Sequence, residues 1–513
     1  MAKMHRSGRE GSIAAPAVRP SAVCAAVLLL AVSPVWLWPP SAAAAETALI
    51  PLPADSVVKD ASMMLLSRSR IVMSEPALAP LAKVLAGEIW QLAGLRLATA
   101  EGAPREGDIA LSIDASMGAE AYELSVGKTA SVRGGTYAAA AMGTATLLQA
   151  MTIPSGGVAA LPHMQVNDRP LAPYRGLMVD VARQRHSVET LKQLVVLCRW
   201  YKINTLQLHL TDDQSFTFPS RSMPGLATPG RQFTLDELTD LETYARDRGV
   251  AILPELDMPG HATAAVKGAP ERLACDPPGR GTICAGNEDT YRALDTLVGE
   301  MCDVFKTSAY FHIGADEVST AAWSRCRNCR AYMARNGLDG TKELYRHFIV
   351  RMNEIVKRHG RKMIVWEGFG KSGAVKIPAD VTVMVFESMY NIAPDVLSGG
   401  HAVINTAWQP LYVTDGRKWS PQHIYGWNMY RWEHWAPVSP AFWRAIVVPQ
   451  TDRVLGAQIC AWDQNDPDEM PSLRQRLAAM AERTWNPHAG RNYADFAARL
   501  KVTDEKLDRL VGP

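Results

Sequence analysis

The sequence predicts an α/β protein in which a (β/α)₈ TIM barrel follows a small α+β domain. The chain has 513 residues, enough for two or three domains. Apolar strand candidates alternate with helical segments over its second part, as in a closed parallel barrel. Polar clusters interrupt these strands at their carboxyl ends, where such a barrel carries its functional residues.

The N-terminal segment, residues 1–45, has the features of a signal peptide. Basic residues come first, an apolar run over 22–38 follows, and the small residues Ser41–Ala45 come last, with cleavage expected near Ala45. No later stretch reaches the roughly 18 apolar residues of a membrane span. We therefore expect an exported protein, periplasmic or secreted, with no stable membrane span after the signal peptide is cleaved. The alternative is an uncleaved N-terminal membrane anchor.

Residues 46–165 form the expected α+β domain. Its predicted helices cover 81–95 and 136–151, and its alternating strands are Ile109–Ile113 and Tyr122–Val126. The Pro-containing stretch 161–173 is either a linker or a terminal strand.

Residues 166–490 form the expected barrel, and 491–513 a C-terminal helical tail. The eight strand candidates begin near Gly176, Asn204, Val250, Ala309, Lys362, Val381, Ala402 and Val454, and predicted helices cover 188–201, 235–248, 290–305 and 344–358. A doubly wound open sheet is the alternative, but no Gly-rich dinucleotide motif follows any strand.

Composition and cysteine content narrow the possible partners. Net charge is only +2, so nucleic acid and anionic membranes are not expected partners. Cys275 and Cys284 bracket a Pro/Gly-rich loop that a disulfide could close. Cys326 and Cys329 form a Cys-x₂-Cys pair, but no second pair or paired His completes a zinc site, so a local disulfide is favoured. No metal and no cofactor are expected.

Six polar clusters follow apolar strands. A single Asp-Asp or Asp-Glu pair after a strand is usually a helix N-cap, but six clusters in matching positions indicate a site. The clusters are Arg175–Asp180, His209–Gln214, Pro254–His261, His312–Val318, Val365–Glu367 and Cys460–Gln464.

These clusters resemble the motifs of glycoside hydrolase family 20, the β-N-acetylhexosaminidases. The resemblance covers about residues 162–485, with Arg-Gly-Leu-Met-Val-Asp, His-Leu-Thr-Asp-Asp-Gln, Pro-Glu-Leu-Asp-Met-Pro-Gly-His and His-Ile-Gly-Ala-Asp-Glu-Val in the order of that family. The domain before the barrel also resembles the α+β domain that precedes the barrel in those enzymes.

The adjacent pair Asp316 and Glu317 favours substrate-assisted hydrolysis. Neighbouring Cα atoms lie about 3.8 Å apart, so both carboxylates approach a sugar from one side. Ordinary glycosidases place two carboxyl groups across the sugar, about 5–5.5 Å or 6.5–9.5 Å apart. Here the 2-acetamido oxygen of the substrate would attack C1. Glu317 would serve as general acid and then base, with a raised pKa, and Asp316 would stay ionised and stabilise the oxazolinium intermediate.

The resemblance also implies a set of substrate-binding residues. Arg175 would bind ring hydroxyls, Asp212 and His261 would orient Asp316, and Tyr412 would bind the acetamido oxygen. Aromatic walls would be Trp366 and Trp462, and Gln464 would contact sugar hydroxyls. For His209 and His312, which lie in the same clusters, the alternative to a role in the site is a purely structural one.

Three departures from the family pattern put substrate preference in doubt. Asp415 is one residue out of register after Tyr412, and Phe386 replaces an expected Trp. Gln464 stands where a carboxylate is expected, unless Asp463 takes its place.

The expected function is exo-acting removal of terminal, non-reducing N-acetylglucosamine or N-acetylgalactosamine from an oligosaccharide or glycoconjugate. A catalytically silent sugar-binding barrel is one alternative, disfavoured by the presence of Glu317. A metal-dependent hydrolase of the same fold is another, disfavoured because no HxH or other tight His spacing follows the first strand.

Overall fold

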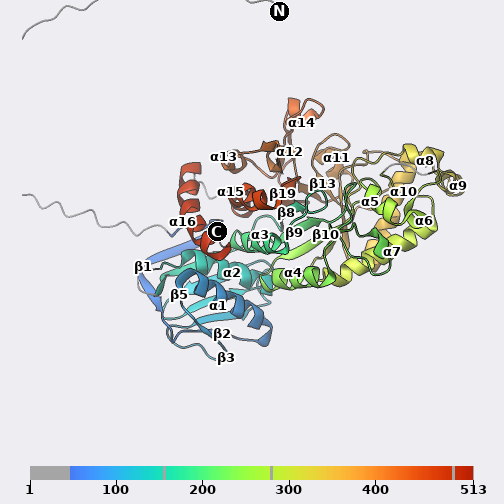
Figure 1. Ribbon diagram of the computed structural model, residues 1–513. Helices are drawn as coiled ribbons and strands as arrows, with labels where there is room; N and C mark the ends of the chain where they lie inside the picture. The colour runs from blue at the N-terminus through green and yellow to red at the C-terminus, as the bar shows by residue number, and fades with distance from the viewer. Residues whose placement is uncertain (1–46, 154–157, 278–280, 488–491, 512–513) are drawn as a thin grey trace, which may run out of the picture. The chain divides into compact units, whose positions relative to one another are not determined.

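The computed structural model describes residues 47–153, 158–277, 281–487 and 492–511 (Figure 1). The expected signal peptide and its anchor alternative lie outside these ranges. Within them, no helix combines the length and the apolar character needed to cross a bilayer.

The N-terminal domain is a seven-stranded mixed sheet carrying two helices, α1 (Ala79–Ala93) and α2 (Tyr137–Ala150). The stretch left open as linker or strand is a strand, β7, which pairs antiparallel with β1 and β5 and runs past the expected boundary at residue 165. The strand order is β1 (Asp55–Leu65), β7 (Ala159–Asp168), β5 (Tyr122–Val126), β6 (Ala130–Gly134), β4 (Ile109–Ile113), β2 (Arg70–Met73) and β3 (Ala98–Glu101).

The second sheet is a closed barrel of eight parallel strands, which confirms the predicted fold and excludes the open sheet. Pairing of β14 with β19 closes it. Each strand begins within two residues of its expected start. The strands in order are β8 (Tyr174–Asp180), β9 (Thr205–His209), β10 (Ala251–Glu255), β11 (Tyr310–His312), β12 (Lys362–Trp366), β13 (Thr382–Val385), β14 (Val403–Asn405) and β19 (Val454–Trp462).

Helices form the outer layer of the barrel, and their ends follow from local sequence. Helix α3 (Val188–Trp200) starts where the Ser187 hydroxyl accepts the Thr190 amide, and α4 (Leu235–Asp247) starts at a capping box of Thr234 and Glu237. The remaining long helices are α7 (Glu288–Val304), α10 (Thr341–Arg358), α15 (Asp466–Trp485) and α16 (Tyr493–Val511). Helix α16 packs on α1 and α3.

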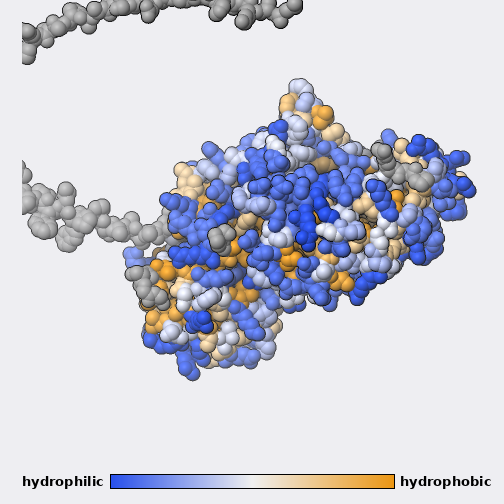
Figure 2. Space-filling view, in the orientation of Figure 1, coloured by the Kyte–Doolittle hydropathy of each residue, from blue (hydrophilic) through white to orange (hydrophobic). Residues whose placement is uncertain are grey.

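Between β14 and β19 the chain makes a long irregular excursion instead of one helix. It contains β15 (Tyr412–Thr414), which pairs with the end of β19, and the short helix α14 (Pro440–Trp443). Large apolar side chains are exposed on this excursion, and Figure 2 shows orange surface at the projection formed by α14. These side chains are Trp435, Val438, Phe442, Trp443 and Val447.

Three buried cations join the amino-terminal half of the barrel to the first domain. Arg175 binds Glu120 at 2.8 Å, Arg199 binds Glu88 at 2.8 Å, and the Lys202 ammonium lies 3.5 Å from Asp168. Arg175 is 0% exposed and also donates to the carbonyls of Ala172 and Lys202. Its donors are therefore committed to the domain junction.

The barrel interior carries a polar chain toward the carboxyl ends of the strands. The Tyr174 hydroxyl donates to Gln458, the Gln458 amide donates to Gln207, and the Gln207 amide donates to Glu255. All four side chains are buried. Because each buried polar group has a partner, this chain fixes the position of Glu255 beneath the candidate site.

Candidate active site

The loop after β11 holds Asp316 and Glu317 in an unusual backbone conformation. Ala315 and Glu317 have φ values of 76° and 47°, in the left-handed region. Gly314, with φ 66°, has no room for a side chain, because a Cβ there would lie 1.7 Å from the Asp257 carboxylate. Left-handed residues of this kind cost energy and are concentrated at functional sites.

Asp316 is a partly buried carboxyl group with one oxygen that has no hydrogen-bond partner among the described residues. Its side chain is 13% exposed, and Oδ1 has no hydrogen-bond partner within the described ranges. Burial raises its pKa, and the nearby His261 opposes that rise. An acceptor is thus held ready in a poorly solvated position.

Glu317 is about half exposed and faces His261. Its Oε2 lies 3.4 Å from His261 Nε2, and this contact lowers the pKa of Glu317. The prediction of a raised pKa for Glu317 is therefore wrong for this unliganded arrangement. The imidazole that the fold places beside Glu317 outweighs the effect expected from the negative charge of Asp316.

His261 connects the three acidic side chains of the site. Its Nδ1 lies 3.4 Å from Asp212, and its Nε2 lies 3.8 Å from Asp316. Hydrogen bonds to Asp212 and Glu317 raise the pKa of His261 to about 12, although burial acts in the opposite direction. His261 is accordingly a cation at neutral pH.

Beneath Asp212 runs a second buried chain of charged groups. His209 lies between Asp212 and Glu255, at 2.9 Å and 2.8 Å. Glu255 also lies 3.1 Å from His312 and accepts from the Trp366 indole at 2.7 Å. His209 and His312 are therefore structural, as in the alternative considered for them, while the supporting role of Glu255 had no signal in the sequence beyond its place in a polar cluster.

Asp316, Glu317 and His261 line one side of a cavity of about 240 Å³. The lining consists of Arg183, His261, Asp316, Glu317, Phe386, Glu387, Trp408, Tyr412, Thr414, Trp462 and Asp463. The Tyr412 ring stacks on Phe386 at 6.1 Å and lies 6.2 Å from Trp462. Trp366 is 1% exposed and packs behind Phe386 and Trp462, so it supports the aromatic wall from behind.

Four expected binding residues do not line this cavity. Asp212 and Trp366 contact residues that do line it, whereas Arg175 and Gln464 make other contacts. Arg175 sits at the amino-terminal end of β8, so the assignment of sugar binding to it is wrong. Gln464 is 1% exposed and points back to the Trp462 carbonyl, so that assignment is corrected as well. Arg183 and Asp463 line the cavity instead.

Arg183 was missed although its position could have identified it. It follows the carboxyl end of β8, whereas Arg175 lies near the start of that strand. Its guanidinium binds Asp180 at 3.0 Å and Asp212 at 2.6 Å, and lies 4.8 Å from the Trp462 ring centre. A donor fork beside an aromatic face is suited to a sugar.

Glu387 was also missed, and Glu367 was identified only as a member of a polar cluster. Glu387 lies in the cavity, where burial and the charges of Glu317 and Asp316 raise its pKa to about 7. Glu367 is fully buried and accepts the amides of Met389 and Tyr390, which fixes the loop after β13. Burial raises the pKa of Glu367 to about 8.

A larger cavity of about 680 Å³ adjoins the first, and Glu317 lines both. Its other lining residues include Lys342, Tyr345, Arg346, Phe369 and Tyr390. Glu317 is thus placed between a small aromatic cavity and a larger one.

The site also contains acidic and histidine groups close enough to suggest a metal. His209 with Glu255 and Asp257 forms one such group, and His261 with Asp212 and Asp257 forms the other. Metal ligation requires neutral imidazole, whereas neighbouring carboxylates raise the pKa of both histidines far above the usual value. These contacts are better described as ion pairs of the protein itself.

Comparison with known proteins agrees with this architecture. The model of glycosyl hydrolase family 20, catalytic domain, matches residues 173–488, and that of domain 2 of the same family matches residues 46–169. A β-hexosaminidase of Porphyromonas gingivalis is 29% identical over 90% of this chain and 63% of its own length. A β-hexosaminidase of Vibrio furnissii is 30% identical over 73% of this chain and 66% of its own length. The chain thus spans about two thirds of the length of these relatives.

A solved structure has a similar fold. The exo β-N-acetylglucosaminidase of Vibrio harveyi, in complex with N-acetylglucosamine, superposes with a TM-score of 0.76 at 26% identity. The match covers 90% of this chain and 77% of that one. With catalytic and second-domain models together spanning nearly all described residues, the chain belongs to glycosyl hydrolase family 20.

Proposed function

We propose that the chain is an exo-acting β-N-acetylhexosaminidase that works by substrate-assisted, retaining hydrolysis. The observation that carries the proposal is the pair Asp316 and Glu317, with Asp316 buried in the aromatic cavity and Glu317 at its junction with the larger one. A terminal sugar would occupy the small cavity and the leaving group the larger one.

The chemistry assigned to the pair proceeds in two steps. In the first, the acetamido oxygen attacks C1 while Glu317 gives its proton to the glycosidic oxygen and the C1–O bond breaks. The oxazolinium then accepts water at C1, Glu317 takes a proton from that water, and the bond from C1 to the acetamido oxygen breaks. C1 is inverted twice, so the product keeps the β configuration.

Asp316 supports both steps electrostatically. Its free Oδ1 is positioned to accept the acetamido N–H, and its negative charge stabilises the oxazolinium in a site with little water. Tyr412 and Trp462 enclose the acetamido group and keep out competing water. Glu317 must leave His261 and gain a proton before it acts as an acid, and we propose that substrate binding in the adjoining cavity drives this change.

Cavity size supports exo action. A volume of about 240 Å³ is below the roughly 300–1,000 Å³ of pockets for drug-sized ligands. It suits one sugar ring, with Arg183 and Asp463 as the polar groups for its hydroxyls. We propose these two residues in place of Arg175 and Gln464.

We further propose that the chain is exported, either to the periplasm or out of the cell, and that the signal segment is removed. The support is the order of basic, apolar and small residues over 1–45. N-terminal sequencing of the exported protein should find a start near residue 46. An intact N-terminus on exported protein would instead support the anchor.

The function is tested with an aryl N-acetyl-β-glucosaminide and the matching galactosaminide. The wild-type protein is expected to release the aryl group, with the β anomer appearing first by NMR. Glu317→Gln should lower kcat/KM by about 10²–10⁴-fold, because it cannot donate or accept the proton. Sugar binding without hydrolysis by the wild type would support the silent barrel instead.

A further inference from the structure

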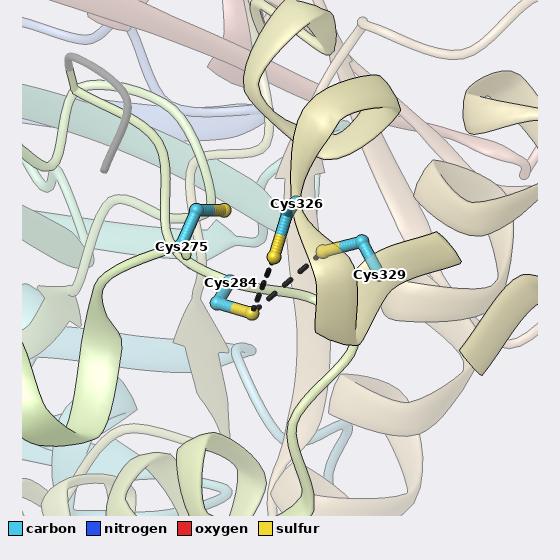
Figure 3. Close-up of side chains that lie close together, drawn as sticks. All are labelled: Cys275, Cys284, Cys326 and Cys329. Carbon is cyan, nitrogen blue, oxygen red and sulfur yellow. Dashed lines mark hydrogen bonds between the residues drawn. The ribbon is translucent and has the colours of Figure 1, made fainter. Parts of the chain in front are cut away.

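Four cysteines from three segments of the chain lie close together (Figure 3). Cys275 follows the short helix α6 (Pro270–Leu273), and Cys284 precedes α7. Cys326 precedes α9 (Arg327–Arg335), and Cys329 lies in its first turn. All four are at most 3% exposed, and their sulfur atoms lie within 4.8 Å of one another.

The separations fit one tetrahedral ion. Cys284 Sγ lies 3.8 Å from Cys326 Sγ and 3.6 Å from Cys329 Sγ. Four thiolates at the usual Zn–S distance of about 2.3 Å are about 3.8 Å apart at the corners of a tetrahedron. A disulfide requires about 2.05 Å between sulfurs, so these contacts are too long for one.

The surrounding backbone is built closely around this group. The Asp276 amide donates to Cys326 Sγ at 3.4 Å. A Cβ on Gly286 would lie 2.3 Å from the Cys329 Cα, so only glycine allows the loop after Cys284 to approach α9 this closely. The other described cysteines, Cys198, Cys302 and Cys460, lie singly on α3, α7 and β19 and are ordinary buried thiols.

We propose that Cys275, Cys284, Cys326 and Cys329 bind one structural Zn²⁺ ion. Four thiolates in a tetrahedron with no open position are typical of structural zinc, and their short span suits a single ion rather than an iron–sulfur cluster. This proposal replaces the expectation of no metal and of two local disulfides. No zinc motif is evident in the sequence, because eight residues separate Cys275 from Cys284 and both lie far from Cys326 along the chain.

The ion would join the two loops that carry the acidic and histidine groups of the active site. On one side, the Ile283 amide bonds the Pro259 carbonyl and the Ala262 amide bonds the Gly281 carbonyl, so the Cys284 segment supports His261. On the other, the Trp323 indole donates to the Ile283 carbonyl at 2.8 Å. Trp323 lies between Glu317 and Cys326 in the chain, so zinc would fix the Glu317 loop against the His261 loop.

Metal analysis of the full chain tests the proposal directly. Protein purified without a chelator or a metal-affinity tag is expected to contain about one zinc per chain. A mercurial that attacks thiolates should release it to a chromophoric chelator. Protein produced with Co²⁺ should show the charge-transfer and ligand-field bands of tetrahedral tetrathiolate cobalt.

Two substitutions sharpen the result. Cys329→Ser should bind less than about a tenth of an equivalent of zinc and melt at a lower temperature. Cys302→Ser, a buried cysteine outside the group, should retain the full equivalent. Wild-type protein with no zinc and two disulfides by mass spectrometry, or with iron in its place, would overturn the proposal, and neither result depends on whether the variants fold.

Discussion

Charged side chains are fully paired at one end of the barrel and only partly paired at the other. At the amino-terminal end, Arg175, Arg199 and Lys202 are buried, and each has an acidic partner in the first domain. At the carboxyl end, Asp316 has a free oxygen, and the pKa values of several acids are displaced. The first end is arranged for stability, and the second retains unsatisfied groups that a substrate can use.

Backbone conformation follows the same division. Of the six non-glycine residues with positive φ in the described ranges, five lie in loops at the carboxyl end: His261, Ala315, Glu317, Ser388 and Asp463. The sixth, Lys202, is at the domain junction. Conformations that cost energy are thus concentrated where chemistry is expected.

Among the substitutions that test this comparison, the largest expected effect comes from removing the charge of Asp316 at the carboxyl end. Asp316→Asn should lower kcat by about 10²–10³-fold, because the neutral amide cannot stabilise the oxazolinium. Asp415→Asn, at an exposed position just after β15, is the control and should keep wild-type kcat. Steady-state kinetics on an aryl N-acetyl-β-glucosaminide measures both, and equal activity in the two variants would contradict the assignment.

The two arginines give a matched test of the comparison between the ends. Arg183→Lys should raise KM about 10–100-fold, since lysine keeps the charge but loses the forked donors. Arg175→Lys should leave kcat/KM unchanged and lower the free energy of unfolding by about 1–3 kcal/mol, because buried acceptors lose their donors. Kinetics and urea unfolding distinguish the two effects, and the reverse pattern would restore the assignment to Arg175.

His261 should control the acid limb of the pH profile. Its positive charge lowers the pKa of Glu317 and opposes the burial that raises the pKa of Asp316. His261→Gln should therefore move the acid limb of kcat/KM, which follows ionisation of Asp316, upward by about one pH unit, and the basic limb, which follows loss of the Glu317 proton, upward as well. An unchanged limb would show that His261 does not act on these carboxyl groups.

The same substitution has a defined effect on stability. The pKa of His261 rises from 6.5 in the unfolded chain to about 12 in the fold. Its contribution to stability is complete below pH 6.5 and declines as pH rises toward 12. Urea unfolding should show a larger loss for His261→Gln at pH 6 than at pH 9.

The smallest effect is expected at Glu387. With a pKa of about 7, it gains a negative charge in the cavity as pH rises through neutrality. Glu387→Gln should remove an ionisation near pH 7 from the kcat/KM profile and change the maximal rate by less than about 10-fold. A profile that keeps this ionisation would assign it to another group.

The sequence was sufficient for the fold because the strands of a parallel barrel are apolar runs at regular intervals. It also located Asp316 and Glu317, which lie side by side in the chain. It failed where function depends on which end of a strand a side chain occupies, as with Arg175 and Arg183. It left Gln464 and Asp463 as alternatives, because their order along the loop does not reveal which of the two side chains faces the cavity.

Contacts between distant segments were beyond sequence reasoning for a different reason. The effect of His261 on Glu317, and the meeting of Cys275 and Cys284 with the Cys-x₂-Cys pair, require loops of two different strands to approach each other. Such approaches depend on the closed barrel and leave no periodic pattern in one sequence.

The most direct test of the account compares two substrates with the same aryl leaving group, one with a 2-acetamido group and one with a 2-hydroxyl. If the acetamido oxygen is the nucleophile, the wild-type protein should hydrolyse the acetamido glycoside. The hydroxyl glycoside should then react at least about 10⁴-fold more slowly. Equal kcat values for the two substrates would contradict the central claim.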